Sequence, residues 1–212
     1  MFLEVFPSGP IETNAYLFAC PTTKKAAVID APFESAEWLI SRSQELSLVI
    51  DKILLTHSHW DHIGDVADLK KATGAQVYVH REDAANLENP GADKLPLLYP
   101  VKGIKADHLL VNGQILQIGT LTVQVICTPG HSAGSVCYYL EKEKVLFSGD
   151  TLFRGTIGNL SFPTSRPDLM GDSLKALAKL PPDVKVYPGH GSPTTIKAEK
   201  WIKQIQIGDR DE

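Results

Sequence analysis

The chain has 212 residues, of which 43% are hydrophobic and 22% are charged, and its formal net charge is -4. These values are ordinary for a soluble globular protein, and the length fits one domain over residues 1–212. Nucleic-acid binding normally needs a basic stripe and a membrane span needs about 18 apolar residues, so the sequence argues against both partners.

The three cysteines, Cys20, Cys127 and Cys137, are an odd number, lie far apart and occupy strand-like runs. This pattern argues against a disulfide framework and favours small buried side chains in a reducing compartment. The first residues, Met1 to Pro10, have neither the basic nor the apolar part of a signal peptide. We therefore expect a cytoplasmic protein.

The first half of the chain contains short runs rich in Val, Ile, Leu and Tyr, bounded by turn-forming residues, which is the pattern of strands. These runs are Leu3–Phe6, Ala15–Ala19, Ala26–Ile29, Lys52–Thr56 and Gln76–His80. Helices are expected at Ser35–Glu45 and Asp61–Thr73, the second ended by Gly74.

The second half repeats the strand pattern. Its runs are Thr122–Cys127, Ser135–Leu140, Lys144–Ser148 and Lys185–Tyr187. The region from Gly119 to Leu140 indicates an antiparallel meander, and Glu141–Lys144 indicates the turn of the hairpin that follows. Helices are expected at Asp168–Leu180 and Ile196–Ile207. Helices placed between groups of strands predict a mixed architecture in which helices cover sheet faces.

The most informative segment is Thr56–His62, which reads Thr-His-Ser-His-Trp-Asp-His. In an extended segment, residues i and i+2 point to the same side, so His57 and His59 can converge on one metal ion. If the chain then turns into a helix, Asp61 and His62 can face a second ion beside the first. Burying four polar side chains together without a ligand would be costly, so the segment predicts a metal site.

Three later strand-like runs each meet a Gly or Pro-Gly break and then a metal-capable side chain. These side chains are His131, Asp150 and His190. Glycine lets the backbone bend sharply beside a site, and functional groups commonly lie on loops held by a rigid scaffold. The repeated design predicts that these residues join the same site. His80 and His108 lack it, and we expect surface or capping roles for them.

Together these segments resemble the metallo-β-lactamase superfamily, and within it the small glyoxalase II-like (hydroxyacylglutathione hydrolase-like) branch. The motifs occur in the family's order: His-x-His-x-Asp-His at 57–62, Pro-Gly-His at 129–131, Gly-Asp-Thr-Leu-Phe at 149–153 and Gly-His-Gly at 189–191. The resemblance extends from Asn14 to Gly191. It implies an α+β fold, the αββα four-layer sandwich, with metals at one edge between the two sheets.

The resemblance also implies a ligand set. One metal ion would be held by His57, His59 and His131, the second by Asp61, His62 and His190, and Asp150 would bridge both. The donors are nitrogen and oxygen atoms, which suit zinc and also accept iron or manganese. We therefore expect two divalent metal ions, with zinc as the first candidate. The bridging aspartate favours the glyoxalase II-like branches over the true β-lactamases.

Two departures from glyoxalase II bear on the substrate. Full-length glyoxalase II has a C-terminal helical domain that contacts glutathione, whereas this chain ends soon after Gly191, which leaves the thiol carrier open. Where many relatives have Gly-Arg-x-Asp, this sequence has Gly158-Asn159-Leu160-Ser161, so the usual arginine–carboxylate pair cannot form.

The expected function is a metallo-hydrolase that attacks a thioester such as S-lactoylglutathione with hydroxide activated by two metal ions, with Asp61 orienting the nucleophile. The main alternative is an iron-dependent, persulfide dioxygenase-like oxidoreductase that uses His57, His131 and Asp150. Nucleic-acid processing conflicts with the acidic balance. A purely structural metal site conflicts with an open two-ion ligand set, because structural zinc sites are closed tetrahedra. The sequence defines neither the substrate-binding residues nor the oligomeric state.

Overall fold

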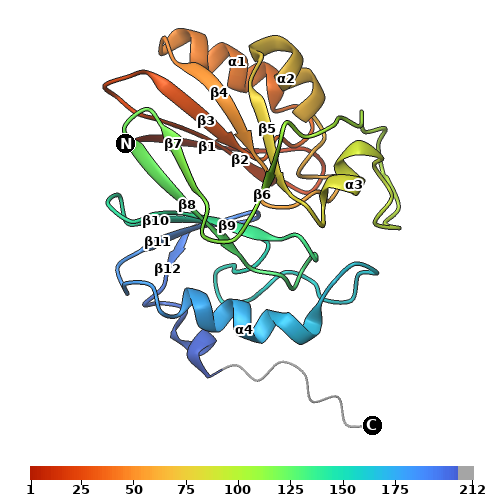
Figure 1. Cartoon of the computed structure of the whole chain (residues 1–212), viewed down its shortest axis with the longest axis vertical. Helices are drawn as coiled ribbons and strands as arrows, with labels where there is room; N and C mark the ends of the chain where they lie inside the picture. Colours follow the sequence, from red (N-terminus) through yellow and green to blue (C-terminus); the bar gives the residue numbers. More distant parts are fainter. Residues whose placement is uncertain (205–212) are drawn as a thin grey trace.

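In the computed structural model, which describes residues 1–204, two six-stranded sheets pack against each other (Figure 1). The first sheet contains, in spatial order, β1 (Phe2–Ser8), β2 (Thr13–Ala19), β3 (Lys25–Ile29), β4 (Val49–Leu54), β5 (Gln76–His80) and β6 (His108–Leu110). The second contains β12 (Thr194–Thr195), β11 (Lys185–Pro188), β10 (Val145–Gly149), β9 (Val136–Leu140), β8 (Leu121–Cys127) and β7 (Ile115–Ile118).

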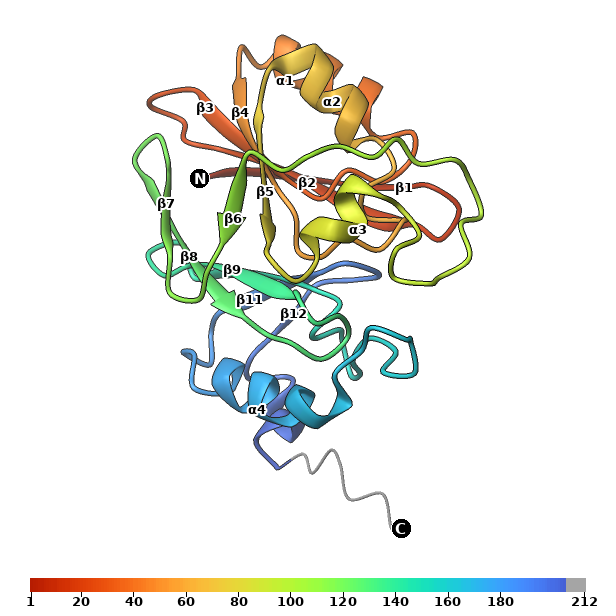
Figure 2. The ribbon, with the colours of Figure 1, turned by 45° about the vertical axis from the view of Figure 1, so that its right-hand side comes forward.

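Helices cover the outer faces of both sheets. The helices are α1 (Ala36–Glu45), α2 (Val66–Thr73), α3 (Ala84–Glu88), α4 (Pro167–Leu177) and the short 3-10 helix η1 (Lys200–Lys203). In Figures 1 and 2, α1 and α2 lie over the first sheet and α4 lies over the second. The order helix, sheet, sheet, helix confirms the predicted αββα sandwich. The expectation of one domain over 1–212 extends past the described residues and stays a prediction.

Strand β2 shows how the layers are joined, because every one of its residues is buried. Successive side chains of a strand point to opposite faces. Leu17 therefore packs in the layer under α1 and α2, whereas Tyr16 and Phe18 pack between the two sheets. Both aromatic rings contact Phe147 of β10, with ring centroids 5.1 and 5.4 Å away. These contacts hold the two sheets in a fixed relative position.

Strand direction determines where the connecting loops meet. Strands β3, β4 and β5 run parallel, as do β10 and β11, while β8 and β10 are both antiparallel to β9. The carboxyl ends of each parallel set meet at one edge of the sheet. At that edge Val136 N donates a hydrogen bond to Thr56 O across the two sheets, at 2.8 Å. The loops that follow β4, β8, β10 and β11 are thereby gathered at one place.

The expected helix Asp61–Thr73 begins later, at Val66. Its first turn is replaced by a bend, because the backbone of 61–65 bonds to a neighbouring loop. His62 O accepts from Ala31 N, and Asp65 N donates to Ala31 O, both at 2.9 Å. Gly64 permits this approach, since a Cβ there would lie 2.6 Å from Phe33 N. The prediction that Asp61 and His62 open a helix was therefore wrong.

The expected C-terminal helix Ile196–Ile207 is also wrong over its described part, where only η1 is helical. The carboxylate of Glu199 accepts hydrogen bonds from Gly155 N, Thr194 Oγ1 and Trp201 Nε1, and these draw the chain into a turn. Residues 205–207 lie outside the described part of the chain. The elements β6, β7, β12 and α3 were not predicted from the sequence, and all four are short.

Every predicted strand run overlaps an observed strand, and the meander and its following hairpin are confirmed by the antiparallel pairs β8–β9 and β9–β10. Strand β4 starts three residues before the predicted run and ends at Leu54, before Thr56. Across residues 1–204 there is no helix whose length and apolar character would let it cross a membrane.

Replacing Phe147 with Ala should destabilise the fold by about 4 kcal/mol, because it removes a fully buried ring from the contact between the sheets. Urea unfolding followed by circular dichroism measures this. Ile115→Ala is the control, since that side chain is 51% exposed and should cost less than about 1 kcal/mol. Equal losses in the two variants would contradict the proposed packing.

Candidate metal centre

The structure brings all seven predicted side chains together at the edge where the sheets meet. Three groups have ligand-type atoms that all lie within 4.8 Å of one another. These groups are His57, His59 and His131; His57, His62 and Asp150; and Asp61, His62 and His190. The first and third match the two predicted ligand sets. Whether these residues bind metal stays a prediction.

Asp150 lies between the two sets, where a bridging carboxylate is expected. Its Oδ2 is 3.4 Å from His131 Nε2 and 3.6 Å from His190 Nε2, and its Oδ1 is 3.4 Å from His62 Nε2. Gly189 allows this approach, because a Cβ at that position would collide with Asp150 Oδ1. The Gly before His190 is therefore required by the close packing of the carboxylate.

Several atoms at the centre fit a bound cation. His57 Nε2, His62 Nε2 and Asp150 Oδ1 are buried and have no hydrogen-bond partner among the described residues. Buried polar atoms in native proteins nearly always have a partner. Nitrogen and oxygen donors that converge in this way are ligands that divalent metals accept. The residues present thus fit the two-metal group that the fold family implies.

His62 is held by Asp30, a residue that the sequence analysis missed. Asp30 is buried at the end of β3, and its Oδ2 accepts from His62 Nδ1 at 2.8 Å and from Thr56 Oγ1 at 2.7 Å. Its Oδ1 accepts from Thr56 N at 2.8 Å. This hydrogen bond through Nδ1 orients the ring so that His62 Nε2 faces the metal position.

Hydrogen bonds on the side away from the metal position also orient three other histidine rings. Thr56 Oγ1 donates to Asp30, so its oxygen accepts from His57 Nδ1 at 3.1 Å. His131 Nδ1 donates to Asn159 O at 2.9 Å, and His190 Nδ1 donates to Ile11 O at 3.2 Å. The backbone of Asn159 thus supports His131 in the segment that departs from the Gly-Arg-x-Asp pattern. The outer nitrogens of these three rings are fixed before any metal binds.

Electrostatics at the centre favour neutral rings on one side and charged groups on the other. Burial lowers the pKa of His57 and lowers that of His59 to about 3. Burial also disfavours a charged His62, but Asp61, Asp150 and Asp30 outweigh it and raise the pKa of that ring. A metal ion at Asp61 and His62 would therefore displace a proton, which links metal binding to pH.

Both carboxylates at the centre are held in the ionised form. Burial alone would raise their pKa values, but the neighbouring His62 outweighs it for Asp61 and for Asp150. Thr13 Oγ1 also donates to Asp61 Oδ2 at 2.8 Å. Ionised carboxylates inside a buried pocket attract a divalent cation strongly.

The two histidines that were not assigned to the site lie outside the three ligand groups. His80 is half-buried at the end of β5, and its Nδ1 accepts from Glu82 N at 3.4 Å. His108 is exposed, and its ring stacks on Tyr78 at 4.4 Å. These positions agree with the surface and capping roles expected for them.

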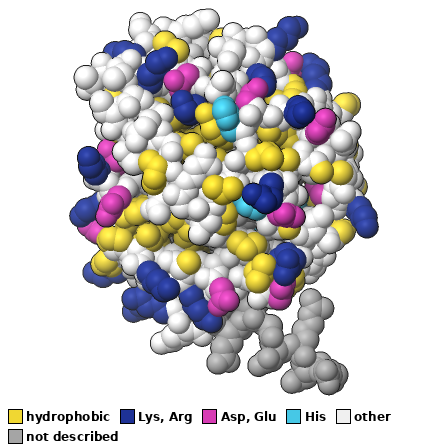
Figure 3. Space-filling model, in the orientation of Figure 1, with side chains coloured by type: hydrophobic (Ala, Val, Ile, Leu, Met, Phe, Trp, Pro, Cys, Tyr) yellow, Lys and Arg dark blue, Asp and Glu magenta, His cyan; other side chains and the backbone are white. Residues whose placement is uncertain are grey.

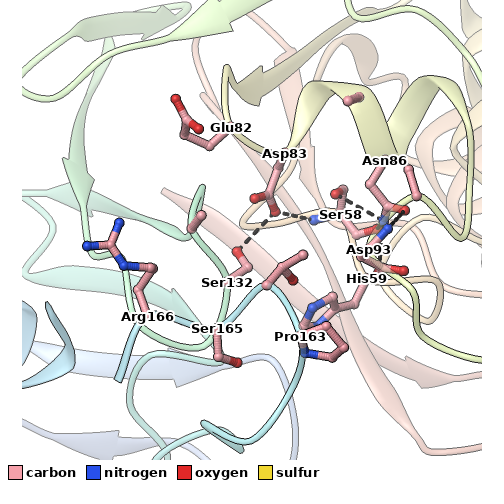
Figure 4. A pocket seen from close by; sticks show the side chains of 14 residues that line it. Ser58, His59, Glu82, Asp83, Asn86, Asp93, Ser132, Pro163, Ser165 and Arg166 are labelled. Carbon is pink, nitrogen blue, oxygen red and sulfur yellow. Dashed lines mark hydrogen bonds between the residues drawn. The ribbon is translucent and has the colours of Figure 1, made fainter. Parts of the chain in front are cut away.

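A second residue that the sequence analysis missed connects the ligand loops. Asp83 is buried just before α3, and its carboxylate accepts from Ser58 N at 2.9 Å, Ser132 Oγ at 3.0 Å and Gly134 N at 2.7 Å. Figure 4 shows Asp83 between Ser58 and Ser132. One carboxylate thus ties the loop of His57 and His59 to the loop of His131.

Comparisons with known proteins agree with this fold and site. The model of the metallo-beta-lactamase superfamily matches residues 8–190. The hydroxyacylglutathione hydrolase GloC of Haemophilus influenzae is 32% identical over 209 residues, which cover 94% of this chain and 95% of that protein. These matches fit the class that the sandwich and the histidine-rich centre define, a metal-dependent hydrolase.

Solved structures give the same result. The crystal structure of BLEG-1 B3 metallo-beta-lactamase is 40% identical, with a TM-score of 0.86, and the match covers 93% of this chain and 96% of that one. TTHA1623, crystallised in a di-iron-bound form, is 36% identical, with a TM-score of 0.81 and coverage of 92% and 96%. The chain belongs to the metallo-β-lactamase superfamily. It is a metal-dependent hydrolase of that superfamily with a histidine-rich dinuclear site.

Replacing Asp30 with Asn should weaken metal binding about 10- to 100-fold, because His62 loses the carboxylate that orients its ring. Competition with a chromophoric zinc chelator measures the affinity. The control is Asp172→Asn, whose carboxylate is 81% exposed on α4 and belongs to none of the ligand groups. Unchanged zinc affinity in the Asp30 variant would contradict the positioning role.

Proposed function

We propose that this chain hydrolyses thioesters of a small thiol, such as S-lactoylglutathione, at a centre that holds two divalent cations, zinc first. The observation that carries the proposal is the pair of nitrogen and oxygen ligand groups on either side of Asp150. The similarity to GloC supports the substrate class, because it extends over 95% of a protein named for hydroxyacylglutathione hydrolysis.

Two bound cations would supply hydroxide at neutral pH by lowering the pKa of a water to about 7, and they would polarise the substrate carbonyl. His57, His59 and His131 would hold one cation, Asp61, His62 and His190 the other, and Asp150 would contact both. The reaction forms a bond between the water oxygen and the carbonyl carbon and breaks the carbon–sulfur bond. Its products are a carboxylic acid and a thiol.

Asp61 is suited to orient the nucleophile. Its Oδ2 already accepts a hydrogen bond from Thr13 Oγ1, which fixes the carboxylate in one orientation. Oδ1 then remains available to accept a hydrogen bond from the attacking water. Because the pKa of Asp61 is lowered by His62 despite burial, the carboxylate keeps its charge during this contact.

Aromatic side chains line the rim of the centre and limit access of bulk water. Phe162 lies edge-on to His59 and His131, with ring centroids 5.4 and 5.5 Å away. Phe153 lies edge-on to His190 at 6.0 Å. Excluding water strengthens the electrostatic interactions inside the site.

A β-lactam is the second candidate substrate, since BLEG-1 B3 metallo-beta-lactamase is 40% identical to this chain. Attack of hydroxide on the lactam carbonyl would break a carbon–nitrogen bond in place of the carbon–sulfur bond. Asp150 favours the thioester, because the resemblance to the superfamily implies cysteine or serine at this position in the true β-lactamases.

The remaining proposals concern partners and location. We propose a small-molecule substrate, with neither nucleic acid nor membrane as partner. In support, Figure 3 shows Lys and Arg interspersed with Asp and Glu on the face that it presents, and they form no stripe there. We also propose a cytoplasmic location, which the three free cysteines support.

Asp150→Ala should release both metal ions together and lower thioester hydrolysis more than about 100-fold, because one carboxylate contacts both ligand groups. Metal analysis of the purified variant and a continuous thiol assay measure the two effects. His80→Ala is the matched control and should keep full metal content and turnover. Full metal content in the Asp150 variant would contradict the bridging role.

A substrate panel tests the reaction class itself. S-lactoylglutathione, a lactone, a β-lactam and glutathione persulfide are offered to the protein loaded with zinc, iron or manganese. We expect the highest kcat/KM with the thioester and no oxygen consumption. Oxygen consumption with the persulfide, and no thioester turnover with any metal, would replace the proposal with the dioxygenase-type reaction.

A further inference from the structure

A pocket of about 330 Å³ lies beside the metal centre, between α3 and the segment 163–166 (Figure 4). His59 lies at one side of the pocket, and Glu82 and Arg166 lie toward the other side, apart from each other, in Figure 4. The volume is within the range of small-ligand sites. The pocket therefore provides a place for a part of the substrate other than the reacting carbonyl.

The histidine at the inner end has an unused polar atom. His59 Nδ1 lies 2.9 Å from His131 Nε2, so Nδ1 is the nitrogen that faces the metal position. Its Nε2, on another side of the same ring, is buried and has no hydrogen-bond partner among the described residues. Because the ring lines the pocket, a molecule bound there would lie beside a metal-capable side chain.

Most of the polar wall is already satisfied by the protein. Asp83 holds the ligand loops, and Asn86 donates to Ser58 O at 2.6 Å and to Asp93 Oδ2 at 3.1 Å. Ser165 Oγ donates to His131 O at 2.7 Å. These bonds make the wall rigid, so it is preorganised for a ligand.

Two charged side chains remain for a ligand. Glu82 is exposed and forms no ion pair with any residue of the described chain. Arg166 donates through Nε and Nη2 to Asp168, which leaves its Nη1 group for another acceptor. Opposite charges on two walls of one pocket match a molecule that carries both charges.

We propose that this pocket binds the α-amino-acid end of the thiol carrier, with its ammonium group at Glu82 and its carboxylate at Arg166. The proposal rests on the proposed thioester hydrolysis for the identity of the substrate. A carrier held there extends toward His59 and so toward the metal centre. The carboxylates of Glu82 and Asp93 disfavour a phosphorylated carrier such as coenzyme A, because like charges repel at short range.

The kinetic test uses S-lactoylglutathione and the same compound with its amino group acetylated. Capping should raise KM about fivefold with little change in kcat, the expected size of one exposed ion pair. Glu82→Gln should raise KM for the uncapped substrate to the same degree and leave the capped one unchanged. Glu88→Gln is the control, since Glu88 is exposed at the end of α3 and does not line the pocket.

Equal KM values for the capped and uncapped substrates, or turnover of lactoyl-coenzyme A as efficient as that of S-lactoylglutathione, would overturn the proposal and leave thioester hydrolysis standing. Calorimetric binding of S-methylglutathione, which cannot be hydrolysed, tests the pocket without turnover. We expect about fivefold weaker binding in Glu82→Gln and in Arg166→Gln. Such weakening in a protein that hydrolyses no thioester would support the pocket and reject the proposed reaction. Unaltered binding in both variants would reject the pocket.

Discussion

The structure depends on gathering seven metal-capable side chains where the two sheets meet, and all of them except the half-buried His190 are buried. Burial of this kind is unfavourable unless the polar atoms find partners. Outer hydrogen bonds from Asp30, Thr56 and the backbone satisfy one side of His62, His57 and His131. Inward-facing atoms, such as His57 Nε2 and Asp150 Oδ1, have no partner in the described chain. Cations are the groups that would satisfy them. The burial of these side chains in the fold and the binding of metal ions therefore depend on each other.

Different segments of the chain carry the metal ligands and form the proposed substrate pocket. The ligands come from the loops that follow β4, β8, β10 and β11, whose positions are fixed by strand pairing and by the packing of Phe147 between the sheets. The pocket next to His59 is built mainly from α3, its flanking loops and the segment 163–166. Changes in these covering segments can alter the substrate and leave the ligand loops in place. This division explains why one fold supports several hydrolytic reactions.

The seven candidate residues could be predicted from sequence because each stands in a local pattern, either the 57–62 motif or a glycine break after a strand. Asp30 carried no such pattern, since its partner His62 is 32 residues away and the contact depends on the parallel pairing of β3 and β4. Asp83 was missed for the same reason. The helix expected from Asp61 failed because Ala31 and Phe33, distant in sequence, determine the bend before α2. Candidate ligands that stand in a local sequence motif can thus be predicted from the sequence. Residues that orient them through contacts between distant parts of the chain cannot.

The most direct test of the two-cation centre is anomalous diffraction from crystals of the protein grown with zinc. The account predicts two peaks about 3.5–4 Å apart. One peak should lie among His57, His59 and His131 and the other among Asp61, His62 and His190, with Asp150 in contact with both. A single peak, or zinc bound only away from these residues, would contradict the account.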